Sequence, residues 1–312
     1  MVARDASAQP RVRAKGPITA LSYSPDGGWL AVGTAPEGGG GAVELYVATS
    51  RSRPSATMPG LSKPVTFVGF THGGKYLAAA DEAGTLVVWS VPDGAQVMRV
   101  ELPKKKGTDN EYRFMAHPHA PYVAWLVRAR GGVEGVVEVV RVPDGKVVTS
   151  ANRMRVGEQA AWSLHGGHLL IDGVAFDWDH LATYKPKRGG VSETSSDGQR
   201  VVSTNPNQCD DFLTVAELAS KKVLRSIALE EGGCPRHLWF ADQDRALVWI
   251  GQRKPSVDGK DPIYDVYLWD ERRDKQRALK KDLGRPIAAA LSHDRKSLAV
   301  TDGRDVVYVS VR

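Results

Sequence analysis

Residues 23–32, YSPDGGWLAV, hold the pattern that decides the fold, which is two apolar segments joined by a turn of Ser, Pro, Asp and Gly. The pattern returns six more times along the chain. One apolar slot recurs in every copy, and successive slots are 47, 46, 46, 32, 46 and 51 residues apart. A supersecondary unit repeated at such a period is typical of a repeat architecture. The slots are Leu30, Leu77, Val123, Leu169, Val201, Leu247 and Leu298.

Each unit continues into a third β-rich run, such as VELYV (43–47), TLVVWSV (85–91) and VVEVVRV (136–142). Val, Ile, Tyr and Trp dominate these runs, and PDG turns at Pro92 and Pro143 end two of them, so we predict strands joined by tight turns. Almost no stretch has a helical period. Units of four strands repeated around an axis predict an all-β, seven-bladed β-propeller of four-stranded antiparallel blades.

Three further motifs carry a family resemblance: SPDG at 24–27, DEAGTLVVW at 81–89, and Trp-Asp pairs at 178–179 and 269–270. With these motifs the chain resembles the WD-repeat (WD/YVTN-type) family of seven-bladed propellers over nearly its full length. The Gly-His pair that usually opens a WD repeat is missing, and most units lack the terminal Trp-Asp. The resemblance implies a rigid, non-catalytic scaffold for protein–protein interaction.

The ends of the chain predict how the ring closes. The last unit stops at Arg312 after its third strand, so we expect the run QPRVRAKG (9–16) to supply the missing outer strand. Residues 1–8 are then a flexible tail, and residues 9–312 form a single propeller domain. Unit four has the shortest spacing, and we expect HLLI, VAFD and LATYK to be its last three strands.

Composition places the chain among ordinary globular proteins, since 42% of its 312 residues are apolar and 25% are charged. No apolar run reaches the roughly 18 residues that cross a bilayer, and the first residues lack the apolar core of a secretory signal. We therefore expect a cytoplasmic protein without a membrane partner. The formal net charge of +6 permits acidic partners without requiring one.

Because strand directions alternate within a blade, the turns after strands one and three share one face, here called the short-turn face. The loops after strands two and four share the opposite, long-loop face. Long loops on a rigid scaffold are where binding usually resides, and basic residues recur in these loops. We expect a protein partner of acidic or mixed charge there, with Trp125 or Tyr184 as an anchor, and the chain could be one subunit of a larger complex. The candidate partner-binding residues are Lys104, Lys105, Lys106, Arg128, Arg130, Lys185, Lys187, Arg188, Arg253 and Lys254.

The same basic residues have two other interpretations. They could form a solvated charged rim, because acidic residues such as Asp109, Glu111 and Asp210 share this face. They could also bind nucleic acid electrostatically, which the scarcity of aromatic residues among them disfavours. The basic run DERRDKQRALKKD (270–282) is expected on the outermost strand of unit six, where charge blocks edge-to-edge pairing.

Histidines and cysteines give no metal or redox signature. His72, His117, His119, His165 and His293 all fall in turns of the short-turn face, but no carboxylate or Cys pattern accompanies them, so we predict no metal site. The two cysteines, Cys209 and Cys234, map to the long-loop face of unit five. They have no CxxC spacing, and we expect free thiols.

A propeller enzyme or small-molecule binder acting at the mouth of the central channel is the main alternative to a scaffold. The residues to consider are Glu111, Glu158, Glu193 and His237 on or near innermost strands. Glu193 is distinctive because the equivalent position holds no charge in any other unit. No spacing joins a nucleophile, a base and an orienting group, so we predict no catalytic residue and no cofactor.

Overall fold

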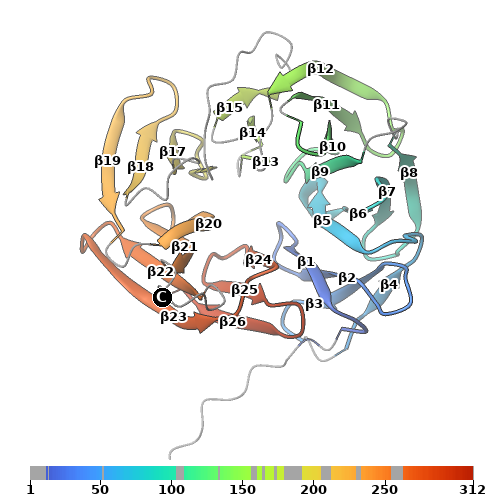
Figure 1. Ribbon diagram of the computed structural model, residues 1–312, viewed down its shortest axis with the longest axis horizontal. Coiled ribbons are helices and arrows are strands. Elements are labelled where there is room, and N and C mark those ends of the chain that lie inside the picture. The colour runs from blue at the N-terminus through green and yellow to red at the C-terminus, as the bar shows by residue number, and fades with distance from the viewer. Residues whose placement is uncertain are drawn as a thin grey trace, which may run out of the picture.

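The computed structural model is all-β and describes residues 12, 14–50, 53–102, 109–132, 134–155, 160–163, 166–171, 174–178, 192–204, 212–229, 233–253 and 263–311. The strands form seven antiparallel sheets, each ordered as in the sequence, and these sheets surround a central axis as the blades of a propeller (Figure 1). Within this part of the chain, no helix is long and apolar enough to cross a membrane. The predicted fold class is confirmed.

Blades one, two and three have four strands each, and a 3-10 turn, η1 (His72–Gly74), joins the first two strands of blade two. Blade one comprises β1 (Ile18–Tyr23), β2 (Trp29–Thr34), β3 (Ala42–Val47) and β4 (Ala56–Met58). Blade two comprises β5 (Val65–Thr71), β6 (Tyr76–Asp81), β7 (Thr85–Ser90) and β8 (Gln96–Glu101). Blade three comprises β9 (Asn110–Ala116), β10 (Tyr122–Ala129), β11 (Glu134–Arg141) and β12 (Val147–Arg155).

The four remaining blades are less uniform. Blade four has three described strands, β13 (Ala160–Trp162), β14 (His168–Ile171) and β15 (Val174–Asp177), and the predicted strand LATYK lies outside the described residues. Blade five comprises β16 (Ser192–Thr194), β17 (Arg200–Ser203), β18 (Phe212–Glu217) and β19 (Val223–Ala228). Blade six comprises β20 (Gly233–Ala241), β21 (Ala246–Arg253), β22 (Tyr264–Asp270) and β23 (Lys275–Leu283). Blade seven comprises β24 (Ala288–Leu291), β25 (Ser297–Thr301) and β26 (Val306–Ser310).

The register of the inner hairpins confirms that the seven predicted slots are structurally equivalent. In each blade the slot residue on the second strand lies opposite the residue that begins the repeated pattern on the first strand. The sequence repeat therefore identifies which residues lie at the same height along the ring axis in the seven blades. The pairs are Tyr23–Leu30, Phe70–Leu77, Ala116–Val123, Trp162–Leu169, Thr194–Val201, Phe240–Leu247 and Leu291–Leu298.

Among the described residues, the core consists of six apolar clusters, and each cluster joins two neighbouring blades. Trp89 lies fully buried in the cluster between blades one and two, and Trp249 is almost fully buried between blades five and six. Burying a large apolar side chain stabilises the fold by roughly 1.5–3 kcal/mol. Both faces of blades one, two, three, six and seven are thus covered by their neighbours, which explains why their strands are mostly apolar. None of the six clusters connects blades four and five within the described residues.

A repeated Ser-X-Asp turn shapes the short-turn face in blades one, five and seven. In blade five the Ser195 hydroxyl donates a hydrogen bond to Asp197 (2.5 Å) and accepts one from the backbone N–H of Arg200 (2.9 Å). Blade one has the same pair in Ser24 and Asp26, and blade seven has it in Ser292 and Asp294. The SPDG-type motif is therefore a self-contained hydrogen-bonded turn.

These turns predict an acid-sensitive contribution to stability. The Ser195 hydroxyl, together with the N–H of Gln199, holds the pKa of Asp197 below its ordinary value. A carboxylate with a lowered pKa stabilises the fold above its unfolded pKa, and this contribution is lost as the pH falls through the folded pKa. We expect Ser195→Ala to reduce the loss of unfolding free energy between pH 5 and pH 3, measured by urea denaturation. An acid dependence equal to that of the wild type would show that the turn hydrogen bond does not set this pKa.

The first residues described by the structure pack at the junction between blades one and seven. Val12 is fully buried in a cluster with Ala299 and Val306 of blade seven. The N–H of Ile18 also donates to the Gly303 carbonyl (2.7 Å), which ties β1 to the loop before β26. Residues 14–16 of the predicted closing strand are also described and precede the first strand, β1, whereas residues 9–11 and 13 and the predicted tail at residues 1–8 lie outside the described residues.

Candidate functional site

Only part of the predicted basic surface can be placed. Arg128 and Arg130 are described, and Arg253 is the last residue of β21, although its side chain is outside the described set. The other seven candidates also lie outside the described residues, namely Lys104, Lys105, Lys106, Lys185, Lys187, Arg188 and Lys254.

The two arginines that can be placed are paired with acids of the same face. Arg128 Nε and Nη2 both contact Glu111 Oε2, at 2.7 and 2.6 Å, and its side chain is only 11% exposed. Arg130 lies 3.7 Å from Asp109 and 3.9 Å from Glu111 and is 72% exposed. Arg128 is thus a structural ion pair across β9 and β10 with little surface to offer a partner, whereas Arg130 is accessible.

The anchor predicted at Trp125 is wrong. Trp125 is buried in the cluster between blades two and three, and its Nε1–H donates to Glu138 Oε2 (2.9 Å). The side chain points into the interface between sheets, because alternate residues of β10 face the neighbouring blade. Tyr184, the other predicted anchor, lies outside the described residues.

Three exposed apolar side chains mark the long-loop face, and the sequence analysis missed them. Phe212 (52% exposed) begins β18, Ile263 (41%) precedes β22 and Ile287 (49%) precedes β24. They belong to blades five, six and seven in succession, and the first two hold nearly equivalent positions at the start of a third strand. The sequence contained a signal for two of them, because a large apolar residue directly follows each of the long polar loops NPNQCDD and GQRKPSVDGKDP.

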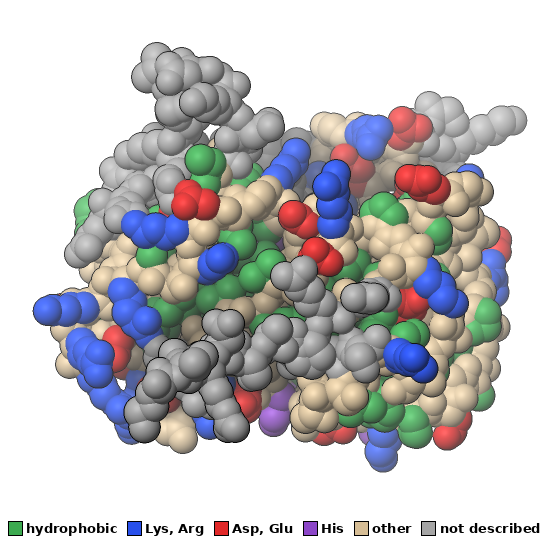
Figure 2. All heavy atoms as spheres, turned by 90° about the horizontal axis from the view of Figure 1, so that it is seen from below, with side chains coloured by type: hydrophobic (Ala, Val, Ile, Leu, Met, Phe, Trp, Pro, Cys, Tyr) green, Lys and Arg blue, Asp and Glu red, His purple; other side chains and the backbone are tan. Residues whose placement is uncertain are grey.

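The rim of the ring carries charges of both signs. Lys275, Arg277, Lys280 and Lys281 are exposed on β23, the outermost strand of blade six, as predicted. Figure 2 views this edge of the molecule and shows basic and acidic side chains interspersed, with hydrophobic ones between them. The described part of this edge therefore carries acidic as well as basic side chains, whereas a polyanion would follow a continuous positive stripe.

On the short-turn face, the fourth residue of each inner turn has a left-handed backbone in six blades. Glycine holds this position in four of them, for example Gly27 (φ 75°) and Gly198 (φ 69°). Blades six and seven place Asp244 (φ 65°) and Arg295 (φ 56°) there instead, although side chains other than glycine are disfavoured in this conformation.

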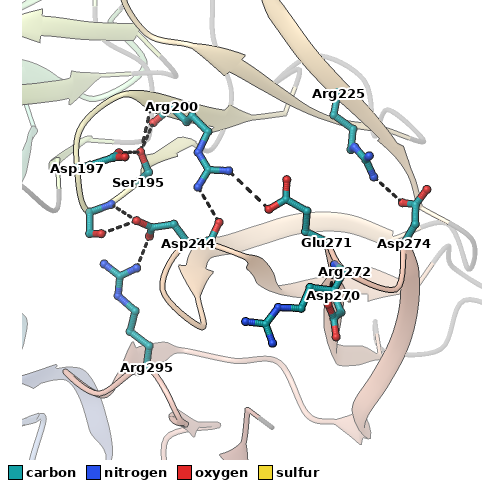
Figure 3. A network of polar contacts seen from close by, with 11 residues as sticks. Ser195, Asp197, Arg200, Arg225, Asp244, Asp270, Glu271, Arg272, Asp274 and Arg295 are labelled. Atoms are coloured by element: carbon teal, nitrogen blue, oxygen red, sulfur yellow. Dashed lines mark hydrogen bonds and ion pairs between the residues drawn. The ribbon is translucent and has the colours of Figure 1, made fainter.

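Those two residues bind one another and join three blades (Figure 3). Arg295 Nη1 donates to Asp244 Oδ1, while Asp244 Oδ2 accepts from the backbone N–H of Ser196 (2.8 Å) and from its hydroxyl. Arg200 Nη2 donates a hydrogen bond to the Asp244 carbonyl (2.8 Å), and Arg200 Nη1 lies 3.8 Å from Glu271 Oε2. The Asp244 carboxylate is only 6% exposed. Because the contacts of Asp244 join blades five, six and seven, we call Asp244 and its partners Ser196, Arg200 and Arg295 the clasp.

A cavity of about 600 Å³ lies at the centre of the ring and extends from the middle of the inner strands to the short turns. One residue from each blade lines the cavity at the position that directly precedes the first-strand member of the hairpin pairs given above. Only one of these seven residues has a charged side chain. The seven residues are Ser22, Gly69, Met115, Ala161, Glu193, Trp239 and Ala290.

The predicted enzymatic candidates do not assemble. Glu111 is held by Arg128, and Glu158 lies outside the described residues. His237 stacks on Trp239 with ring centres 5.6 Å apart, and loss of solvation, reinforced by Arg236, lowers the pKa of His237 to about 4. Its imidazole is therefore neutral at pH 7 and a weak base. Of the three described candidates, only Glu193 lines the cavity.

Among the turn histidines, His117 has a structural role. His117 is buried, and its Nδ1 accepts hydrogen bonds from the backbone N–H groups of His119 and Ala120. Among the described residues, no group of three or more His, Cys, Asp or Glu side chains is arranged to hold a metal ion. His165 and Cys209 lie outside the described residues, as does the side chain of Cys234.

Comparison with known proteins agrees with this architecture. The family model of the WD domain, G-beta repeat (WD40), matches residues 10–39 and 52–90. The second match runs from the outer strand of blade one through three strands of blade two. A search of curated proteins found no match to the sequence.

Solved structures show the same fold at low identity. The β-propeller domain of Myceliophteria thermophila Cps50 (Swd1) superimposes with a TM-score of 0.67 over 97% of this chain and 98% of that one, at 14% identity. In all, 1537 chains of solved structures match, so the architecture by itself does not select a function. Residues 10–39 and 52–90 are therefore similar to WD repeats, and the solved structures show that the chain has the fold of a β-propeller.

Proposed function

We propose that this protein is a non-catalytic, cytoplasmic scaffold that presents its long-loop face to a partner protein. WD-repeat propellers generally serve as scaffolds for protein interaction, and this chain has the rigid ring and long loops that such a role needs. The observation that carries the proposal is the set of exposed apolar residues Phe212, Ile263 and Ile287 on that face.

Exposed apolar residues are ordinary when they are scattered singly. Here three of them lie on one face of three consecutive blades, and two of them, Phe212 and Ile263, directly follow loops of that face. Aromatic and aliphatic anchors surrounded by polar residues are the usual energetic centre of an interface. We propose that these three side chains form the apolar centre of the partner site.

The basic loop residues of blades two and three belong to the same face, across the ring from that centre. Lys104, Lys105 and Lys106, with the exposed Arg130, would attract an acidic or mixed-charge partner and raise the rate of encounter. Arg128 has no part in this, because Glu111 already neutralises it. The same charges acting on nucleic acid would instead give binding that weakens steeply with salt.

Affinity capture of the tagged protein from native extract, analysed by mass spectrometry, tests the proposal with matched variants. For the variant Phe212→Ser/Ile263→Ser/Ile287→Ser, we expect the amount of captured stoichiometric partner to fall at least about tenfold, because interface anchors contribute more than about 1 kcal/mol each to binding. Reversing Lys104, Lys105 and Lys106 to Glu should weaken capture further at low salt.

The control is Val223→Ser/Leu224→Ser, which removes equally exposed apolar residues from the outermost strand β19 on the rim. This control should retain the partner. Loss of the partner in the rim variant but not in the long-loop variant would contradict the assignment of the face. Recovery of nucleic acid in place of protein would support the electrostatic alternative.

A further inference from the structure

We infer that the outer edge of β23 is a binding site for an acidic polypeptide segment, which would pair with β23 as an added strand. β23 is the last strand of the blade six sheet and lies on the outer rim of the ring (Figure 1). Within the described residues, no strand pairs with its outer edge. A strand in this position presents unpaired N–H and C=O groups, to which an extended segment can add by main-chain hydrogen bonds.

Three basic side chains of β23 form a row on one face of the strand. Each lies opposite every second residue of β22, and because alternate residues of a strand share a face, their partners share one as well. The pairs are Lys275–Asp270, Arg277–Leu268 and Lys280–Val266. An irregular register between residues 278 and 280 returns Lys280 to this face, although it is three residues beyond Arg277. We call Lys275, Arg277 and Lys280 the basic row.

The basic row keeps its charge. All three side chains are exposed, and within the described part of the chain none of them has an ion-pair partner. The acids of the preceding turn contact other cations, because Asp270 Oδ2 lies 3.7 Å from Arg273 Nε and Asp274 Oδ1 lies 2.8 Å from Arg225 Nη1 of blade five (Figure 3). β23 itself carries one acid, Asp282, near its far end. An acidic segment would therefore complement the net positive charge of the row.

The propeller fold does not require such a row on an outer strand. The described side chains of the other fourth strands, β4, β8, β12 and β19, include two cations, and each of them has a partner. Arg99 pairs with Glu101 at 3.1 Å, and Arg225 pairs with Asp274. Basic residues on an exposed edge oppose pairing with a like strand. The same charges attract an acidic strand, so the row would select its partner by charge.

The spacing of the row defines the segment that would fit. Side chains two residues apart on one strand are about 7 Å apart, so acids at every second position would face the row. The opposite face of β23 holds Gln276 and Ala278, which are half-buried, so neutral residues would occupy the intervening positions. A nucleic acid would meet the same charges but has no main-chain amides to continue the sheet. None of these residues belongs to the proposed partner face, so this site and the proposed function can fail independently.

Calorimetric titration of the full chain with the end-capped peptide Thr-Glu-Val-Glu-Val-Glu-Thr, and with its analogue in which Gln replaces each Glu, tests the inference. The acidic peptide is expected to bind with a Kd of about 1 mM or tighter, and at least about fivefold more tightly than the analogue, because several exposed ion pairs each contribute modestly. The difference should shrink as salt is raised from about 0.05 M to about 0.5 M. Equal binding of the two peptides, or none at about 5 mM of either, would overturn the inference.

Hydrogen-exchange mass spectrometry locates the bound peptide. Backbone amides of residues 275–283 should exchange more slowly in the complex, because an added strand supplies acceptors for the outward N–H groups. Slower exchange only in other segments would refute the added strand.

Variants test the basic row itself. Lys275→Gln/Arg277→Gln/Lys280→Gln should abolish the preference for the acidic peptide. The control Lys75→Gln/Lys146→Gln/Lys222→Gln removes the same charge from exposed positions in the short turns and should retain the preference. Equal loss in both triple variants would show that net charge, and not the row, attracts the peptide. Tighter binding of a thymidine oligonucleotide of equal charge, lost in the row variant, would assign the row to nucleic acid and overturn the inference.

Discussion

Asp244→Ala is expected to lower the free energy of unfolding by about 3 kcal/mol, because it leaves the largely buried Arg295 guanidinium and the Ser196 N–H without their acceptor. Chemical denaturation measures the change. Asp244→Gly should cost less, since it restores the residue type that the left-handed position holds in four other blades. The order of the two variants separates the lost carboxylate from backbone strain.

A double-mutant cycle between Asp244 and Arg295 isolates their coupling, for which we expect about 1–3 kcal/mol. The matched control is Asp274→Ala, which removes a carboxylate that is 71% exposed and pairs with Arg225 across blades five and six. Exposed pairs contribute at most about 1 kcal/mol. If Asp244→Ala is as stable as the control Asp274→Ala, the clasp does not stabilise the ring.

Deleting residues 1–16 is expected to lower the melting temperature by at least about 5 °C or to drive association through the exposed edge of blade seven. We propose that residues 9–16 close the ring as the outer strand of that blade. The burial of Val12 against Val306 supports this, as does the WD40 match that begins at residue 10, because the second match begins at the corresponding outer strand of blade one.

The control for this experiment is deletion of residues 1–8, which the sequence assigns to a tail and which should leave the melting temperature unchanged. Calorimetry and size-exclusion chromatography provide the two readouts. A monomer of unchanged melting temperature after removal of residues 1–16 would defeat the closing-strand proposal.

Much of the fold was predictable because the repeat carries both period and register. The seven slots aligned the inner hairpins, and the positions just before their partners located Glu193 in the cavity set. The ion pair of Arg128 was also within reach. Counting outward from the Ala116–Val123 pair places Glu111 opposite Arg128 on the same hairpin.

The clasp at Asp244 could not be found in this way, because its partners Ser196 and Arg295 are 48 and 51 residues distant and lie in two other blades. A repeat shows which positions are equivalent, but not which side chains reach across a seam. The buried position of Trp125 was predictable, because Trp125 lies two residues beyond the slot residue Val123 on the same strand and both side chains join one buried cluster. Assigning each strand residue to a face, as the alternation of side chains requires, would have corrected the prediction.

Cross-linking mass spectrometry of the captured complex with a lysine-reactive reagent is the most direct test of the central claim. The chain has lysines on both faces, so a partner bound to either face would form cross-links to the lysines of that face. We predict that partner cross-links gather at Lys254 and Lys260, in the loop that precedes Ile263, and at Lys63 and Lys104–Lys106 of the same long-loop face. Cross-links gathered instead at Lys75, Lys146, Lys222 and Lys296, which lie in the short turns, would contradict it.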